Sequence, residues 1–170
     1  KAAEKVMKNE PDYGLGKNIA IRYLSADDYT KAETYFKKVL DLAPGNTDKA
    51  EILIYLGSIE AKKGSKVAAR NYYREASSAD PNNKDAYEKI GDLYYQSFDD
   101  CKKMDNYADD RLVYLAAYDM YQRAGDAKKM AAAKAQFPSK EELFTQGYEA
   151  GATMRVGCWI NESVVLRTRE

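Results

Sequence analysis

Small, aromatic and apolar residues recur along the middle of the chain at intervals that predict packed helices. In two stretches a small residue is followed by a ring four positions later, then by an apolar or small residue, and then by a proline. These stretches are Ala32, Phe36, Val39 and Pro44, and Ala69, Tyr73, Ala76 and Pro81. Intervals of three and four place side chains on one face of a helix. The small residue lets a neighbouring helix approach closely, and the ring fills the adjacent space. The pattern therefore predicts antiparallel helix pairs.

The prolines mark the ends of the predicted helices. Pro11, Pro44, Pro81 and Pro138 each follow a helix-forming stretch, and proline disfavours helical geometry in the residue before it. The first three prolines are 33 and 37 residues apart. This spacing predicts a helix-turn-helix repeat of about 34 residues.

A third helix pair follows, with an interruption. The first helices of the three pairs share an apolar residue followed by a small one: Ile19-Ala20, Leu56-Gly57 and Ile90-Gly91. Residues 97–110 are polar and acidic, and Ala117, Tyr121 and Ala124 then restore the spacing of a second helix. We interpret residues 97–110 as a loop insertion, and residues 127–136 as a helix that covers the end of the stack.

Over about residues 13 to 97 these positions resemble the tetratricopeptide repeat family. Gly16 and Leu53 stand where the family has an aromatic residue early in the first helix, and Tyr87 supplies one in the third repeat, so the repeats are degenerate. The resemblance implies an all-α superhelical solenoid, and stacked pairs of this kind present a concave groove to a peptide or protein.

The same repeat spacing predicts the boundaries of the segments that make up the chain. Residues 1–9 precede Pro11 as a second helix would, and we interpret them as the last helix of an upstream repeat. Residues 13–138 are expected to form an array of about three repeats with its capping helix. Residues 139–170 are expected to form a C-terminal helix and a β-hairpin tail.

The tail changes from a helical to an alternating period. Met154, Val156, Cys158 and Ile160 alternate with Arg155, Gly157 and Trp159. Residues 163–168 are rich in valine. Two strands that turn at Asn161-Glu162 therefore form the predicted hairpin.

Two segments of the tail carry a second resemblance. Residues 137–142 and 157–162 resemble the C-terminal ending of some bacterial tetratricopeptide repeat proteins that tend to be exported. This resemblance implies the periplasm or cell envelope rather than the cytoplasm.

The amino-acid composition narrows the range of possible functions. The chain of 170 residues has 27 basic and 27 acidic residues, a balance that argues against nucleic acid as a partner. It contains no histidine, the usual acid–base residue near neutral pH. No apolar run reaches the roughly 20 residues that span a bilayer, so this segment is not expected to insert into a membrane. We therefore expect a non-catalytic scaffold without a cofactor.

The resemblance also implies candidate binding residues, because ligands in this family contact variable positions on the first helices. Those positions are Lys17, Ile21, Leu24, Ile54, Ser58, Lys62, Asp85, Glu88, Asp92 and Tyr95. They form a surface that runs from mixed apolar and basic to acidic, suited to an extended segment with apolar anchors and some positive charge. The alternative is an ordinary solvated face. A chaperone-tail clamp does not fit, because Ile21 stands where that clamp needs asparagine.

The cysteines and the acidic insertion leave alternatives open. Cys101 and Cys158 either form one disulfide between the insertion and the tail, or remain two unrelated thiols. Two distant cysteines without histidine make a poor zinc site. The insertion lacks the alternation of a calcium loop, so a solvated loop is favoured and no metal is expected.

Two further functions compete with the scaffold. The valine-rich C-terminal strand could add to the sheet edge of a second copy and form a homodimer. The chain could also be an accessory region of a larger enzyme.

Overall fold

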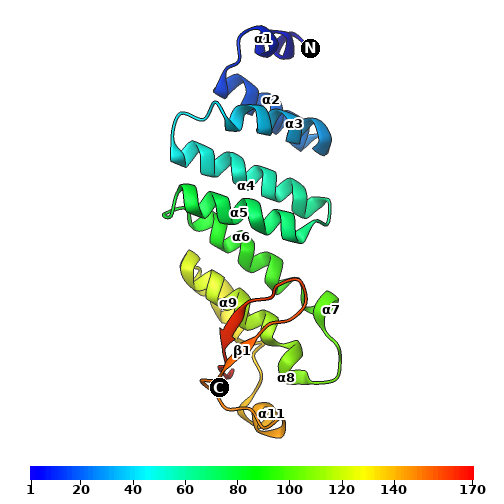
Figure 1. Ribbon diagram of the computed structural model, residues 1–170, viewed down its shortest axis with the longest axis vertical. Helices are drawn as coiled ribbons and strands as arrows, with labels where there is room; N and C mark the ends of the chain where they lie inside the picture. Colours follow the sequence, from blue (N-terminus) through cyan, green and yellow to red (C-terminus); the bar gives the residue numbers. More distant parts are fainter. The chain divides into compact units, whose positions relative to one another are not determined.

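The computed structural model describes residues 1–170 and confirms the predicted fold class, with helices through most of the chain and a small antiparallel sheet near its C-terminus (Figure 1). The chain forms two compact units, residues 1–86 and residues 87–170. None of its helices has the length and apolar character needed to cross a membrane.

The first unit consists of consecutive helices joined by short turns (Figure 1). They are α1 (Ala2–Asn9), α2 (Tyr13–Ser25), α3 (Tyr29–Leu40), α4 (Asn46–Lys62) and α5 (Lys66–Ala79), followed by the start of α6 (Lys84–Tyr95). Aspartates begin two of these helices: Asp12 accepts a hydrogen bond from the Leu15 amide at 2.7 Å, and Asp28 accepts one from the Lys31 amide at 3.1 Å. Such caps satisfy amides that a helix start leaves without a partner.

Helices α2 and α3 pack as one pair, and α4 and α5 pack as the next. Ala32 and Ala69 are completely buried, as the pattern predicts. Phe36 stacks on Tyr55 with ring centroids 4.7 Å apart. A Cβ atom added to Gly57 would lie 2.5 Å from Cε1 of Tyr73, so the ring of α5 occupies space that only glycine leaves open.

The second unit repeats this contact. It holds the rest of α6, then α7 (Phe98–Cys101), α8 (Tyr107–Asp110), α9 (Leu112–Ala124), α10 (Ala127–Lys134) and α11 (Lys140–Thr145), and strands β1 (Thr153–Arg155) and β2 (Ser163–Val165). A Cβ atom added to Gly91 on α6 would lie 2.6 Å from Cε1 of Tyr121 on α9. Ala117 is buried. The delayed helix α9 therefore meets α6 as α5 meets α4.

The insertion is more ordered than the solvated loop that the sequence predicts. Residues 97–110 contain the single-turn helices α7 and α8. The Asp110 carboxylate is buried and accepts hydrogen bonds from the backbone amides of Lys103 and Met104, at 2.8 and 2.9 Å. This acidic side chain therefore closes a turn.

The hairpin is shorter than predicted. Thr153 pairs with Val165 and Arg155 with Ser163, so β1 ends five residues before Ile160. Cys158 and Asn161 have φ values of 60° and 49°, which a β-strand cannot accommodate. Residues 156–162 consequently form a loop. Strand β2 packs against α9 (Figure 1).

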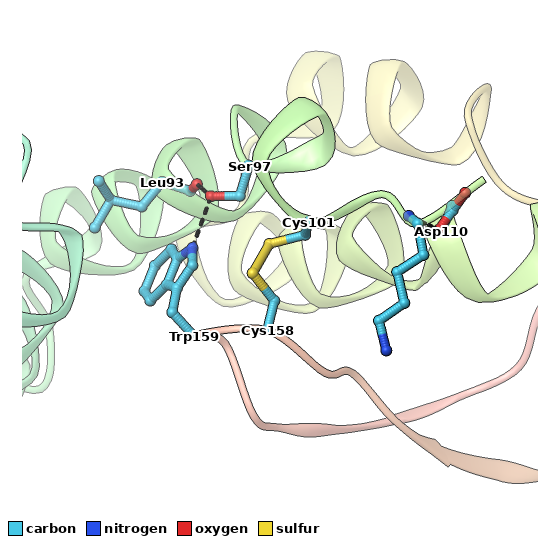
Figure 2. The surroundings of a disulfide bond; sticks show 7 residues. Leu93, Ser97, Cys101, Asp110, Cys158 and Trp159 are labelled. Atoms are coloured by element: carbon cyan, nitrogen blue, oxygen red, sulfur yellow. Dashed lines mark hydrogen bonds between the residues drawn. A yellow bond between two sulfur atoms is a disulfide. The ribbon is translucent and has the colours of Figure 1, made fainter. Parts of the chain in front are cut away.

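This loop, residues 156–162, is linked to α7 by a disulfide and to α6 by a hydrogen bond. Figure 2 shows the disulfide between Cys101 and Cys158, whose Cα atoms are 5.6 Å apart. The Trp159 indole nitrogen donates a hydrogen bond to the Ser97 hydroxyl at 3.1 Å, and that hydroxyl donates to the Leu93 carbonyl at 2.6 Å (Figure 2).

A second contact lies beside the disulfide. The Tyr94 hydroxyl donates to the Glu162 carboxylate at 2.6 Å, and the Tyr94 and Trp159 rings are 5.5 Å apart. The short hairpin is therefore held on the helices by a covalent bond, hydrogen bonds and ring packing, which supply the support that an isolated hairpin lacks.

The glycine–ring contact predicts opposite effects for two glycine substitutions. Gly57→Ala forces the Tyr73 ring to move, and we expect it to lower the free energy of unfolding by about 1–3 kcal/mol. Gly14→Ala is the control, because Gly14 is exposed and the nearest atom to an added Cβ, Asp12 Oδ1, is 3.5 Å away. It should leave stability unchanged or raise it by up to about 1 kcal/mol. Urea unfolding measures both, and equal effects would contradict the packing account.

The disulfide predicts a thiol count and a loss of stability. The denatured, unreduced protein should contain no titratable thiol, whereas two reactive thiols would exclude the bond. The bond closes a loop with a sequence separation of 57, so replacing both cysteines by serine should lower the free energy of unfolding by about 2–4 kcal/mol. The reduced parent protein is the matched control, and its unfolding curve should coincide with that of the double variant.

Candidate partner-binding surface

The first helix of the first pair, α2, carries three of the candidate residues on one face. Ile21 and Leu24 are half-buried and pack against the core of the first unit. Lys17 is also half-buried, and its Nζ lies 2.6 Å from Oε2 of Glu51 on α4. This face is therefore mainly apolar, and its one cation is already paired.

The first helix of the second pair, α4, carries three more. Ile54 is 9% exposed, so it belongs mostly to the core. Ser58 is half-buried, and its hydroxyl lies 3.3 Å from the Tyr73 hydroxyl. Lys62, at the end of α4, is exposed. Of the six candidates on α2 and α4, Lys62 is the most open to a partner.

Two contacts hold α2 beside α4. One is the Lys17–Glu51 ion pair, and the other is a long hydrogen bond of 3.5 Å from the Tyr13 hydroxyl to the Asp48 carbonyl. Burial acts to lower the pKa of Lys17, but the hydrogen bond and charge of Glu51 outweigh it, so the pKa is raised. Lys17 therefore stays protonated at neutral pH and forms a charged link between the two first helices. The structure brings these six candidates onto adjoining helices of one unit.

The acidic candidates on α6 differ in their surroundings. Asp85 is exposed at the start of the helix. In the second unit, Lys129 of α10 places its Nζ 2.5 Å from Oε1 of Glu88 and 2.9 Å from Oδ1 of Asp92. Lys129 therefore offsets one of the three negative charges at the acidic end of the predicted surface.

Two tyrosines complete this cluster. The Tyr121 hydroxyl donates to Asp92 Oδ1 at 2.9 Å. Burial, with the nearby Asp92 charge, raises the pKa of Tyr121, so its hydroxyl remains a donor. Tyr95 packs edge-on against Tyr114, with ring centroids 5.1 Å apart. Tyr95 is therefore partly committed to packing within its own unit.

Sequence reasoning did not single out Glu51 or Lys129, which pair with the candidate residues. Glu51 lies 34 residues from Lys17, the length of one repeat, and that spacing is a signal that could have suggested the pair. Lys129 follows the helix cap Asp126, whose carboxylate accepts its amide hydrogen at 2.9 Å. The direction of the Lys129 side chain depends on how α10 packs, so no local sequence pattern predicts its ion pairs.

Three of the five charged candidate residues are paired within the protein. Lys17, Glu88 and Asp92 are each held in ion pairs. The structure contains no group of three or more cysteine or acidic side chains arranged to hold a metal ion. What remains for a partner is half-buried apolar surface, polar groups and the exposed charges of Lys62 and Asp85.

Comparisons with known proteins agree with this architecture. Residues 18–46 and 50–83 match the family model described as tetratricopeptide repeat. These two matches fall on α2–α3 and α4–α5, the helix pairs of the first unit. No curated protein matches the chain.

Three solved structures align with the chain at low sequence identity. Two crystal structures of MamA are 22% and 21% identical to the chain, each with a TM-score of 0.57. Both cover 86% of this chain, and the alignments cover 75% and 70% of the MamA chains. The C-terminal part of a TPR repeat-containing protein from Cytophaga hutchinsonii is 18% identical over 79% of this chain and 55% of that chain, with a TM-score of 0.49.

At these identities the two MamA structures support the fold alone. The Gly91–Tyr121 contact between α6 and α9 resembles the Gly57–Tyr73 contact between α4 and α5. The family model matches the residues of α2 to α5. Helices α2 to α5 therefore form tetratricopeptide repeats.

Proposed function

We propose that this protein is a non-catalytic interaction scaffold that binds a peptide or protein on the adjoining faces of α2 and α4. The observation that carries this proposal is the Lys17–Glu51 ion pair, which holds the two first helices side by side. Their candidate residues then lie on one surface of one unit. Repeats of this fold generally function as protein-interaction scaffolds.

The chemistry of the surface suggests the character of the partner. Ile21 and Leu24 supply apolar area, and Ser58 supplies a hydroxyl already oriented by Tyr73. Lys62 adds an exposed positive charge at one end. An extended segment with apolar anchors and an acidic residue near Lys62 would complement these groups.

The acidic cluster on α6 receives a different role in this proposal. Glu88 and Asp92 bind Lys129, so their charges serve the fold of the second unit. Asp85 is the acidic candidate that stays exposed. Because Lys129 offsets one of these three negative charges, a partner needs less positive charge than the sequence alone suggests.

The disulfide supports a proposal about location. Disulfides persist in oxidising compartments and are rare in reducing ones. We propose that the protein works outside the cytoplasm, in the periplasm or cell envelope, which agrees with the sequence resemblance of its tail. Alkylation of free thiols at the moment of cell lysis tests this, because the proposal requires Cys101 and Cys158 to be protected in the native cell.

Charge reversal at Lys62 tests the binding surface. The assay uses a partner purified with the full-length protein from its native cells. Lys62→Glu should raise the dissociation constant for this partner about three- to tenfold, mainly through slower association. Lys38→Glu makes the same charge change at an exposed residue of the second helix α3. This control should change the affinity less than about twofold. Equal losses of affinity for both variants, or no loss for either, would exclude α2 and α4 as the binding surface.

Neutralising Asp92 tests whether the acidic cluster serves the fold. Asp92→Asn weakens the ion pair with Lys129 and its hydrogen bond from Tyr121, and we expect a loss of about 1–2 kcal/mol in the free energy of unfolding, reduced by partial solvent exposure. Asp85→Asn removes one exposed charge from the same helix and should stay within about 0.5 kcal/mol of the parent. Chemical denaturation of both variants measures the difference. If Asp92→Asn leaves the free energy of unfolding unchanged, Asp92 is again a candidate for the partner surface.

A further inference from the structure

Strand β1 has one edge that no other strand of the protein covers, because the sheet consists of β1 and β2 alone. Just after β1, the Val156 amide donates a hydrogen bond to the Glu162 carbonyl at 2.7 Å. Hydrogen-bonded pairs alternate along an antiparallel ladder, so the backbone groups of Thr153 and Arg155 point away from β2. These groups form no hydrogen bond within the protein, and both residues are exposed.

The opposite edge of the sheet, on β2, is less open. The Val165 carbonyl accepts a hydrogen bond from Nε of Arg167 at 3.3 Å. The same guanidinium is held by Asp119 of α9, whose Oδ1 lies 2.6 Å from Nη2. A side chain of the protein therefore occupies part of the β2 edge. The free pairing groups that attract an additional strand remain on β1.

A small pocket lies beside the open edge of β1. Its apolar lining includes Met154 of β1 and Leu112 and Val113 of α9. Cys101 and Cys158 also line it, and their disulfide, seen in Figure 2, keeps the insertion beside the chain that follows β1. The pocket has a volume of about 210 Å³. Small-molecule sites usually have roughly 300–1,000 Å³, so this pocket suits a single apolar side chain.

The exposed charges around the pocket are two cations and one carboxylate. Lys103 and Arg155 line the pocket, are exposed and form no ion pair within the protein. Asp109 is also exposed, and its carboxylate accepts a hydrogen bond from the Tyr148 hydroxyl at 3.0 Å. The second carboxylate of the lining, Asp110, is buried against two backbone amides. An incoming chain therefore meets two unpaired cations.

From the open edge, the pocket and these cations we propose that β1 binds an extended segment of a partner protein as a third, antiparallel strand. Side chains alternate between the two faces of a strand. The partner residue opposite Met154 enters the pocket and is apolar, and the residue opposite Arg155 lies beside the guanidinium and is acidic. Such cross-strand charge pairs are favourable, and the main-chain hydrogen bonds of an added strand supply affinity.

A partner protein complements this edge better than a second copy of the chain does. Neither β1, with the sequence Thr-Met-Arg, nor β2, with Ser-Val-Val, contains a carboxylate. Pairing β1 with either strand of another copy would leave Arg155 without an acidic neighbour in the added strand. The site lies in the second unit and uses no residue of α2 or α4. It is therefore an interaction surface separate from the one proposed above.

Short blocked peptides that alternate glutamate and leucine test the proposal on the 170-residue chain with its disulfide intact. In the expected antiparallel pairing, the glutamate amides donate to β1 and the leucine amides point away from it. Methylation of the glutamate amide nitrogens should therefore raise the dissociation constant at least about tenfold. Methylation of the leucine amide nitrogens is the matched control and should change it less than about threefold. Titration calorimetry measures both.

Reversing the charge of Arg155 tests the acidic position of the partner. Arg155→Glu should raise the dissociation constant of the glutamate peptide about fivefold, and should lower that of a peptide with lysine in place of glutamate. Lys128→Glu makes the same charge change at an exposed residue of α10 and should alter either constant less than about twofold. Arg155 Nε donates to Asn161 Oδ1 at 2.8 Å, and tighter binding of the lysine peptide would show that the variant keeps its fold without this bond.

Amide exchange locates the peptide on the protein. The amides of Thr153 and Arg155 should exchange rapidly in the free protein and slow about tenfold at saturating peptide, because they then donate to the added strand. Met154 is the internal control. It pairs with Val164, so its amide already points toward β2 and its exchange should change much less.

Three results would overturn the proposal. The first is absence of peptide binding, or equal effects of the two methylations. The second is unchanged amide exchange at Thr153 and Arg155 with peptide bound. The third is a dimer of the free chain in light scattering that Arg155→Glu abolishes, because the edge would then pair two copies. Lys62→Glu should leave the peptide affinity within about twofold. A loss confined to Lys62→Glu would place the peptide on α2 and α4 instead, so failure here is distinct from failure of the proposed binding surface.

Discussion

The fold depends on the close approach of two helices at a glycine. The rings of Tyr73 and Tyr121 occupy the space where Gly57 and Gly91 lack a side chain. The contact recurs in both compact units, although the insertion at residues 97–110 separates its two partners in the second. A ring against backbone buries a large apolar area in a small volume, so a thin layer of two helices gains a dense core. The remaining features of the protein are arranged around these pairs.

Packing of this kind determines which charged groups remain for a partner. Lys17 reaches Glu51 because α2 and α4 adjoin, and Lys129 reaches Glu88 and Asp92 because α10 packs against α9 in the second unit. Charges that are matched inside the protein contribute less to recognition, so the proposed surface on α2 and α4 is mainly apolar. Its specificity should come from shape and from the exposed charge at Lys62.

The sequence predicts the helix pairs well because their determinants are local. The positions of Ala32, Ala69 and the prolines define helix faces and helix ends without knowledge of the tertiary structure. The tail is harder to predict. Alternating residues suggest a strand through Ile160, but the left-handed backbone at Cys158 and Asn161 ends it early, and non-glycine residues rarely adopt that conformation. The salt bridge of Lys129 and the separation of Cys101 from Cys158 depend on how distant segments pack, so sequence spacing alone does not contain them.

Nuclear Overhauser measurements in solution test the glycine–ring contact most directly. Strong effects are expected between the α-protons of Gly57 and the ring protons of Tyr73, and between those of Gly91 and Tyr121, with glycine signals shifted upfield by the rings. Absence of both effects in the folded protein, with the glycine α-protons at ordinary chemical shifts, would contradict the account.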